Sequence, residues 1–75
     1  MSPYANHSGK AGITAFELGG DYLDIRFVDG SVYRYTYQST GVSNIEKMKK
    51  LALAGRGLTT FINKTVRTQY ALKLH

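Results

Sequence analysis

The chain has 75 residues, 10 basic and 5 acidic side chains, a formal net charge of +5 and no cysteine. This length fits one small domain with a thin core. The lack of cysteine excludes a disulfide framework and any cysteine-based metal or nucleophile site. No apolar run approaches the roughly 20 residues that cross a bilayer, and the first ten residues lack the apolar core of a signal peptide. We therefore expect a cytoplasmic protein.

The positive charge is concentrated in the second half of the chain. Residues 1–42 hold three basic and four acidic side chains, a balance of −1. Residues 43–75 hold seven basic side chains against Glu46 alone, a balance of +6. Such asymmetry indicates an anionic partner, such as a nucleic acid or a membrane surface. The alternative is a solvated helix face that keeps the protein soluble.

The first 21 residues predict an N-terminal segment without regular structure, then a strand and a turn. Residues 1–10 show no periodicity, so we expect a flexible N-terminal lead before a single domain over residues 11–72. Within this lead, His7 has no second candidate ligand nearby and is expected to be an ordinary polar residue. Residues 13–18 favour a first strand with imperfect alternation. The Gly19-Gly20-Asp21 cluster that follows predicts a turn.

The stretch from Tyr22 to Tyr37 predicts a β-hairpin around Asp29-Gly30. Leu23, Ile25 and Phe27 alternate with polar residues, which is typical of a half-buried strand. A three-residue loop, residues 28–30 with a left-handed glycine at its end, sets apolar residues opposite tyrosines. It also sets two opposite charges across the other face. We therefore predict the pairs Leu23–Tyr35, Asp24–Arg34 and Ile25–Tyr33, with Leu23, Ile25, Phe27, Tyr33 and Tyr35 on the inner face.

Two helices are expected after the hairpin. Ser43 and Glu46 match a capping box, so the first helix is predicted over residues 44–54, with an apolar stripe at Ile45, Met48, Leu51 and Ala52. Gly55 is a helix stop. The second helix is predicted from residue 58 or 59 to near residue 70, with a stripe at Leu58, Phe61, Ile62, Val66 and Tyr70. Ala71 to His75 are expected to be frayed, and we place the C-terminal boundary of the domain at residue 72, before residues 73–75.

The expected architecture is α+β: a three-stranded antiparallel meander followed by two α-helices packed on one sheet face. Strands first and helices afterwards are typical of this class. No repeat, linker or low-complexity segment is visible in the sequence.

The order of these pieces resembles the KTSC domain, a short module named from the C-terminal end of some lysyl-tRNA synthetases. The resemblance is carried by the run from Leu23 to Tyr35 with its central Tyr33-Arg34-Tyr35, and by a glycine-containing link before the second helix. It covers roughly residues 13–70. The chain departs from the family pattern in lacking a proline between Tyr35 and the first helix. It also has Ala-Gly-Arg-Gly at residues 54–57, where the family has Ser-Lys-Gly. The family includes small stand-alone bacterial proteins, and its function is not established. RNA binding has been suggested for it, and the resemblance implies no more than that. Because the predicted register turns Tyr33 and Tyr35 toward the helices, we expect the Tyr33-Arg34-Tyr35 motif to be structural. The alternative is that these tyrosines stack bases of a single-stranded nucleic acid.

The sequence offers no catalytic constellation. The acidic side chains are explained by turns, by the helix cap and by the Asp24–Arg34 pair, and both histidines fall in predicted tails. We therefore expect a protein that is not an enzyme and needs no cofactor or metal ion.

The expected ligand is RNA or another polyanion, and we do not expect the protein to bind a membrane. The candidate contacts are the basic residues of the helical half: Lys47, Lys49, Lys50, Arg56, Lys64 and Arg67. The Gly55-Arg56-Gly57 link before a helix could bind a phosphate, or it could be a simple helix–helix turn. The outer sheet face, with Tyr22, Arg26 and Arg34, is a weaker aromatic and basic platform because Asp24 lies on it. The alternative function is a protein-interaction or self-associating module that uses an exposed sheet face or edge.

Overall fold

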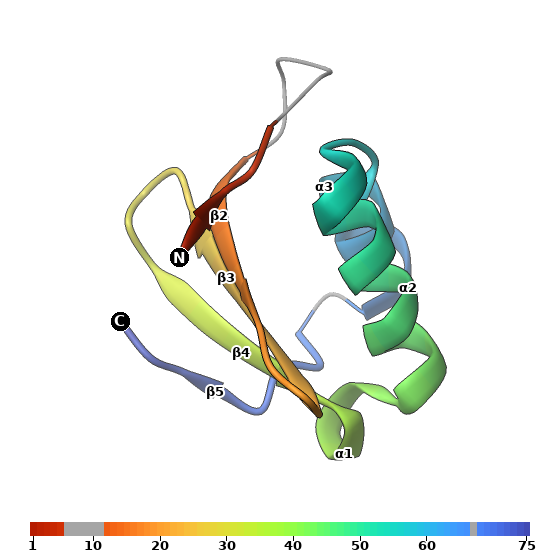
Figure 1. The fold of residues 1–75 in the computed structure, drawn as a ribbon. Helices are drawn as coiled ribbons and strands as arrows, with labels where there is room; N and C mark the ends of the chain where they lie inside the picture. The colour runs from red at the N-terminus through yellow and green to blue at the C-terminus, as the bar shows by residue number, and fades with distance from the viewer. Residues whose placement is uncertain (6–11, 67) are drawn as a thin grey trace.

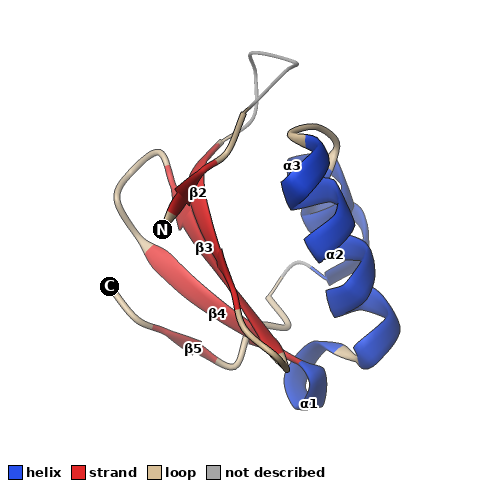
Figure 2. Cartoon of the chain, in the orientation of Figure 1, coloured by secondary structure: helices blue, strands red, loops and turns tan. Residues whose placement is uncertain are grey.

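The protein, described here by a computed structural model over residues 1–5, 12–66 and 68–75, is an α+β fold. A single antiparallel sheet has the strand order β1-β2-β3-β4-β5, and the helices lie together on one side of it (Figure 1). The strands are β1 (Ser2–Pro3), β2 (Ile13–Leu18), β3 (Tyr22–Phe27), β4 (Val32–Thr36) and β5 (Leu72–Lys73). Between β4 and β5 the chain forms α1 (Tyr37–Thr40), α2 (Val42–Ala54), α3 (Leu58–Phe61) and a π-helical turn, η1 (Ile62–Val66), as Figure 2 shows.

The predicted hairpin register is confirmed. Leu23 pairs with Tyr35, Asp24 with Arg34 and Ile25 with Tyr33. The loop has three residues, and Gly30 at its end has a φ of 90°, the left-handed conformation that glycine adopts without steric cost. Because the side chains of a strand alternate between faces, this register places Leu23 and Ile25 with their partners Tyr35 and Tyr33 on the side of the helices.

The imperfect alternation of the first strand has a structural cause. Between Ile13 and Ala15 the register against β3 shifts, so that Thr14 and Ala15 together oppose Arg26. Such a β-bulge inserts one residue and changes the face on which the following side chains lie. Ile13 and Phe16 are therefore both buried under the helices although their positions are an odd number, three, apart.

The described residues at both chain ends, where the sequence predicted a flexible lead and a frayed end, contribute short strands to the sheet. Ser2 and Pro3 pair with β2, and the following Tyr4 is buried in the core. At the other end, Leu72 and Lys73 pair with β4. The sheet consequently has five strands where the sequence predicted three, because isolated two-residue strands carry no periodic pattern. Residues 6–10 of the expected lead, including His7, lie outside the described residues.

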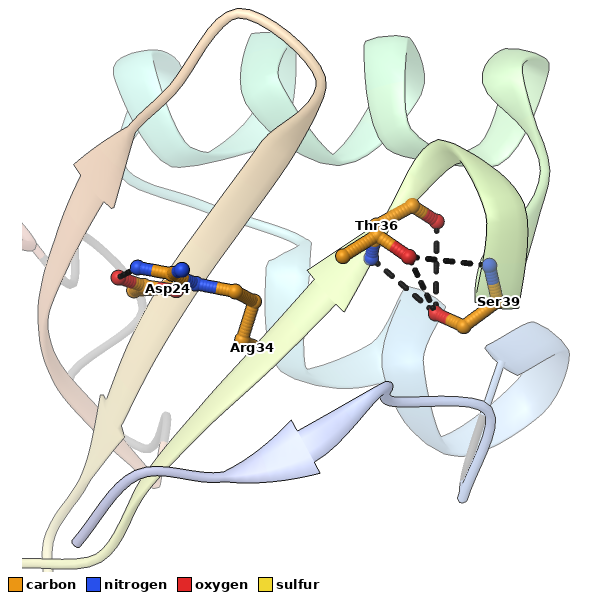
Figure 3. A network of polar contacts seen from close by, with 4 residues as sticks. All are labelled: Asp24, Arg34, Thr36 and Ser39. Carbon is orange, nitrogen blue, oxygen red and sulfur yellow. Dashed lines mark hydrogen bonds and ion pairs between the residues drawn. The ribbon is translucent and has the colours of Figure 1, made fainter.

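The predicted capping box at Ser43 and Glu46 is wrong. Helix α2 begins two residues before the expected start, and its N-cap is Gly41, which has a φ of 102° and no side-chain cap bond. A capping box does occur one element earlier, where Thr36 and Ser39 exchange side-chain and backbone hydrogen bonds at the start of α1 (Figure 3). The short helix α1 breaks the chain direction after β4, and this turn determines where α2 can begin.

The end of α2 and its apolar face agree with the prediction. Ile45, Met48 and Ala52 are buried. Gly55 ends the helix in the left-handed conformation, and its amide donates to the carbonyls of residues 51 and 52.

The second predicted helix is shorter and less regular than expected. It consists of the four-residue α3 followed by η1, and it ends at Val66 instead of near Tyr70. Thr40 is buried and donates to the Gln69 carbonyl at 2.7 Å, and the Ala71 amide donates to the Arg34 carbonyl at 2.6 Å. These bonds draw the chain back to the sheet, which excludes a further helical turn.

The core lies between the inner sheet face and the helices. Its fully buried members come from β2, β3, β4, α2, α3 and η1, and they are joined by Tyr4 from the N-terminal segment. The Tyr4 hydroxyl accepts a hydrogen bond from the Leu58 amide at 3.3 Å. The N-terminal segment is thereby tied to the start of α3, 54 residues further along the chain.

Candidate functional site: a basic helical surface and an aromatic groove

Two of the predicted lysines form an exposed basic strip on α2. Lys47 and Lys50 are exposed. They are three residues apart, so they lie next to each other on the helix, on the side opposite the buried Ile45, Met48 and Ala52. Both ammonium groups can therefore reach a ligand that lies on the helical layer.

Lys49, which was also predicted to bind, has internal partners instead. Its ammonium group donates to the Gly20 carbonyl at 3.0 Å and lies 3.2 Å from a Glu46 oxygen. It also lies 5.4 Å from the centre of the Tyr37 ring. Glu46 accepts a hydrogen bond from the Tyr37 hydroxyl at 2.6 Å, and this bond together with Lys49 lowers the pKa of Glu46. Lys49 thus links α2 to the β2–β3 turn and contributes little free charge.

The remaining predicted cations are distributed along the second part of the helical layer. Arg56 is exposed in the link after α2, and Lys64 is exposed on η1. Arg67 lies outside the described residues. The link does not form a phosphate site at a helix start, because α3 has only four residues and the Leu58 amide already donates to the Tyr4 hydroxyl.

The outer sheet face holds an internally satisfied ion pair. Arg34 donates from Nε and from a terminal nitrogen to the two carboxylate oxygens of Asp24, at 2.8 and 2.9 Å (Figure 3). The Asp24 side chain is 4% exposed, and the Arg34 guanidinium lies 4.0 Å from the centre of the Tyr22 ring. The hydrogen bonds to Asp24 raise the pKa of Arg34 further. This arrangement is suited to holding the two hairpin strands in register, and its charge is already neutralised.

The inner sheet face opens into a groove at the hairpin end, with a volume of about 450 Å³. One wall is formed by the inner-face rings and the hairpin loop, and the other by the start of η1 and the segment before β5. The lining residues are Gly12, Phe27, Val28, Asp29, Ser31, Tyr33, Tyr35, Ile62, Asn63 and Tyr70.

Four aromatic rings form a continuous cluster in this groove. The Tyr33 ring lies 5.7 Å from Phe27, edge to face, and 4.5 Å from Tyr70. Tyr70 also meets Tyr35 edge to face at 6.0 Å. Tyr35 is 2% exposed, and burial raises its hydroxyl pKa to about 12. Tyr33 and Tyr70 are only half-buried, so parts of their rings face the groove.

The rim of the groove is polar. The Asp29 carboxylate accepts from the Ser31 amide at 2.9 Å and from the Ser31 hydroxyl at 2.6 Å, both through Oδ1. These bonds hold the pKa of Asp29 below its usual value. The Lys73 ammonium lies 5.7 Å from the centre of the Tyr33 ring, and Asn63 is exposed on η1.

Sequence reasoning placed Tyr33 and Tyr35 correctly on the inner face but missed the groove beside them. Asn63 and Tyr70 were assigned to a continuous helix, and Lys73 was assigned to a frayed end. The predicted apolar stripe placed Tyr70 toward the sheet, but it gave no sign of an open groove beside Tyr33. The aromatic character of Tyr70 was the one signal that could have drawn attention to it.

Among the described residues, no helix is long and apolar enough to cross a membrane. The same residues contain no cluster of three or more histidine, cysteine, aspartate or glutamate side chains that could hold a metal ion.

Comparison with known proteins adds no relative. No protein-family profile, no curated protein and no solved structure matches the chain. The resemblance to the KTSC domain therefore stays a prediction that rests on the motif residues of the hairpin and the link.

Proposed function

We propose that the chain is a small, non-enzymatic, KTSC-like binding module whose helical layer contacts the phosphate backbone of RNA. One observation carries the proposal: the exposed cations of the described helical layer share it with a single acidic side chain, which is already bonded. Glu46 is the one acidic side chain of residues 43–75, and it is already bonded to Tyr37 and Lys49. The charge of Lys47, Lys50, Arg56 and Lys64 is therefore available to an anionic ligand.

Contacts of this kind provide affinity without a choice of sequence. Lysine and arginine neutralise phosphates and release condensed counterions, so the affinity falls with rising salt. Phosphate contacts position a nucleic acid but do not identify its bases. We therefore expect binding of a generic RNA that is tight at low salt and much weaker at physiological salt.

Single charge reversals test this proposal. Lys47→Glu, Lys50→Glu and Lys64→Glu each change the net charge by two units, and Arg26→Glu makes the same change on the outer sheet face, where Arg26 is exposed. We expect the three helical variants to weaken binding of a labelled RNA and to lower the slope of log K against log salt by about 0.7 per lost single-strand contact. Arg26→Glu should leave that slope unchanged. Equal effects of all four variants would show that net charge alone, and not the helical layer, attracts the RNA.

A second candidate function is protein interaction or self-association through the outer sheet face. The helices leave this face uncovered (Figure 1), and β5 and the residue after it contribute the exposed side chains Leu72 and Leu74. Addition of a partner strand is less favoured, because both edge strands have only two residues. Sedimentation over a range of concentrations separates the two candidates: a stable dimer without RNA binding at low salt would favour this one.

A further inference from the structure

The groove beside Tyr33 has the properties of a ligand site and is not used by the helical cations. Its volume of about 450 Å³ lies in the range of small-molecule sites. Such sites have mostly apolar and aromatic walls with a few polar groups that orient the ligand. Phe27, Tyr33 and Tyr70 supply the aromatic walls here, and Asn63 and Asp29 supply the polar groups.

The backbone around the groove is also unusual. Ile62 and Asn63, which form part of one wall, open the π-helical turn η1. Turns of this type are rare and are often found at functional sites. Asn63 of this turn is exposed and lines the groove.

The charges beside the groove favour a ligand with an anionic group. The Lys73 ammonium group lies 5.7 Å from the centre of the Tyr33 ring. The carboxylate of Asp29 is bonded to Ser31 through Oδ1, and its second oxygen can accept a hydrogen bond from a ligand. The groove thus offers flat rings, one carboxylate, one amide and the ammonium group of Lys73 beside it.

We infer that this groove binds a base of single-stranded RNA, stacked against the ring of Tyr33, with its phosphate near Lys73. A nucleotide satisfies each part of the groove: the planar base contacts the rings, its edge meets Asn63 and Asp29, and its phosphate faces Lys73. A cationic ligand is disfavoured because Lys73 already lies close to Tyr33. The inference rests on the proposed RNA contact by the helical layer and adds a preference for single strands, since paired bases are stacked inside a duplex and cannot enter.

The test compares two tyrosine variants of the full chain. Tyr33→Leu removes the stacking ring from the groove but keeps an apolar side chain beside Phe27. Tyr22→Leu removes a half-buried tyrosine from the opposite face of the same hairpin and is the matched control. Circular dichroism and an amide NMR spectrum establish that both variants are folded. The probes are a fluorescent ten-nucleotide oligoadenylate and a fluorescent RNA duplex of ten G·C-rich base pairs, which stays paired in low salt.

We expect the wild-type protein to bind the single strand more tightly than the duplex. Tyr33→Leu should weaken single-strand binding by about 5- to 150-fold, the usual effect of losing one stacked base, and Tyr22→Leu should change it less than twofold. Wild-type-like binding by folded Tyr33→Leu, or equal affinity for both probes, would overturn the inference and leave the helical contact standing. No binding of either RNA by the wild-type protein would overturn the proposed function itself.

A measurement on the wild-type chain keeps the test independent of variant folding. Adenosine 5′-monophosphate and ribose 5-phosphate are titrated separately while the ring signals of Tyr33 and Tyr70 and the side-chain amide of Asn63 are followed by NMR. Shifts with the nucleotide and not with the sugar phosphate support base stacking in the groove. Identical shifts with both ligands, or none at these residues, would contradict it.

Discussion

Tyr4 provides a direct test of whether the N-terminal segment belongs to the folded domain. The tyrosine follows β1, is 6% exposed, and accepts a hydrogen bond from the Leu58 amide at 3.3 Å. Its own amide donates to the Thr14 carbonyl at 3.0 Å. If residues 1–10 were the flexible lead that their composition suggests, substitutions at Tyr4 would have no effect on stability.

The expected loss of stability follows from burial and from one hydrogen bond. Replacing a buried large aromatic residue by alanine costs about 3–5 kcal/mol. We take the lower end, about 3 kcal/mol, for Tyr4→Ala because a terminal segment can partly collapse into the space. Tyr4→Phe removes only the hydroxyl. The bond of 3.3 Å is long, so we expect a loss of about 0.5–1 kcal/mol. A domain of this size has a total stability of roughly 4–11 kcal/mol, so the alanine variant loses a large part of it.

Urea denaturation followed by circular dichroism measures both effects. With a slope near 1 kcal/mol/M for a small domain, Tyr4→Ala should lower the midpoint by about 3 M and Tyr4→Phe by less than 1 M. Ser2→Ala is the control, because it alters an exposed side chain of the same segment. If Tyr4→Ala has the same midpoint as Ser2→Ala, the segment is not part of the core and the five-stranded sheet is refuted.

Two further predictions concern polar groups of the hairpin. Arg34→Met leaves the Asp24 carboxylate buried without its partner, whereas Asp24→Asn leaves a guanidinium that can reach water. The arginine variant should therefore be the less stable one, and the double variant should recover part of the lost stability. Urea denaturation of the wild type, both single variants and the double variant measures this double-mutant cycle, and additive losses of stability would contradict the prediction. Ser31→Ala should raise the pKa of Asp29 toward its ordinary value, as measured by a carboxyl NMR titration. The lowered pKa of Asp29 in the folded wild-type protein adds stability above the unfolded pKa that disappears as the pH falls through the folded value. The variant should thus be less stable at neutral pH, and the difference should shrink in acid; a difference that is independent of pH would exclude this contribution.

The central hairpin could be predicted because its information is local. Alternation fixes which side chains share a face, and Asp29-Gly30 fixes the loop. Opposite charges and apolar partners then select one register, and the pairs Leu23–Tyr35 and Asp24–Arg34 are the observed ones. The apolar stripe of α2 and its stop at Gly55 are local in the same sense.

The misplaced elements depend on contacts between distant residues. Two-residue strands at the chain ends have no period, and they exist because β2 and β4 offer backbone groups for pairing. The second helix ends early because Gln69 and Ala71 bond to residues some 30 to 40 positions earlier. The start of α2 was misjudged because Ser43 and Glu46 fit a capping pattern that Thr36 and Ser39 complete instead.

The candidate sites also differ in how much of each could be predicted from the sequence. The basic character of the helical half follows from composition, but only the structure distinguishes the exposed Lys47 and Lys50 from Lys49, whose partners come from a strand turn and from Glu46. The groove could not be predicted, because it forms where the hairpin, the turn η1 and the C-terminal segment meet.

The sequence by itself therefore determined the α+β class, the hairpin register and the location of the positive charge, since each depends on the spacing of neighbouring residues. Only the tertiary structure decided the five-stranded sheet, the short second helix and the aromatic groove. Each of these is held by hydrogen bonds and packing between segments far apart in the chain, and such contacts leave no periodic trace in a single sequence.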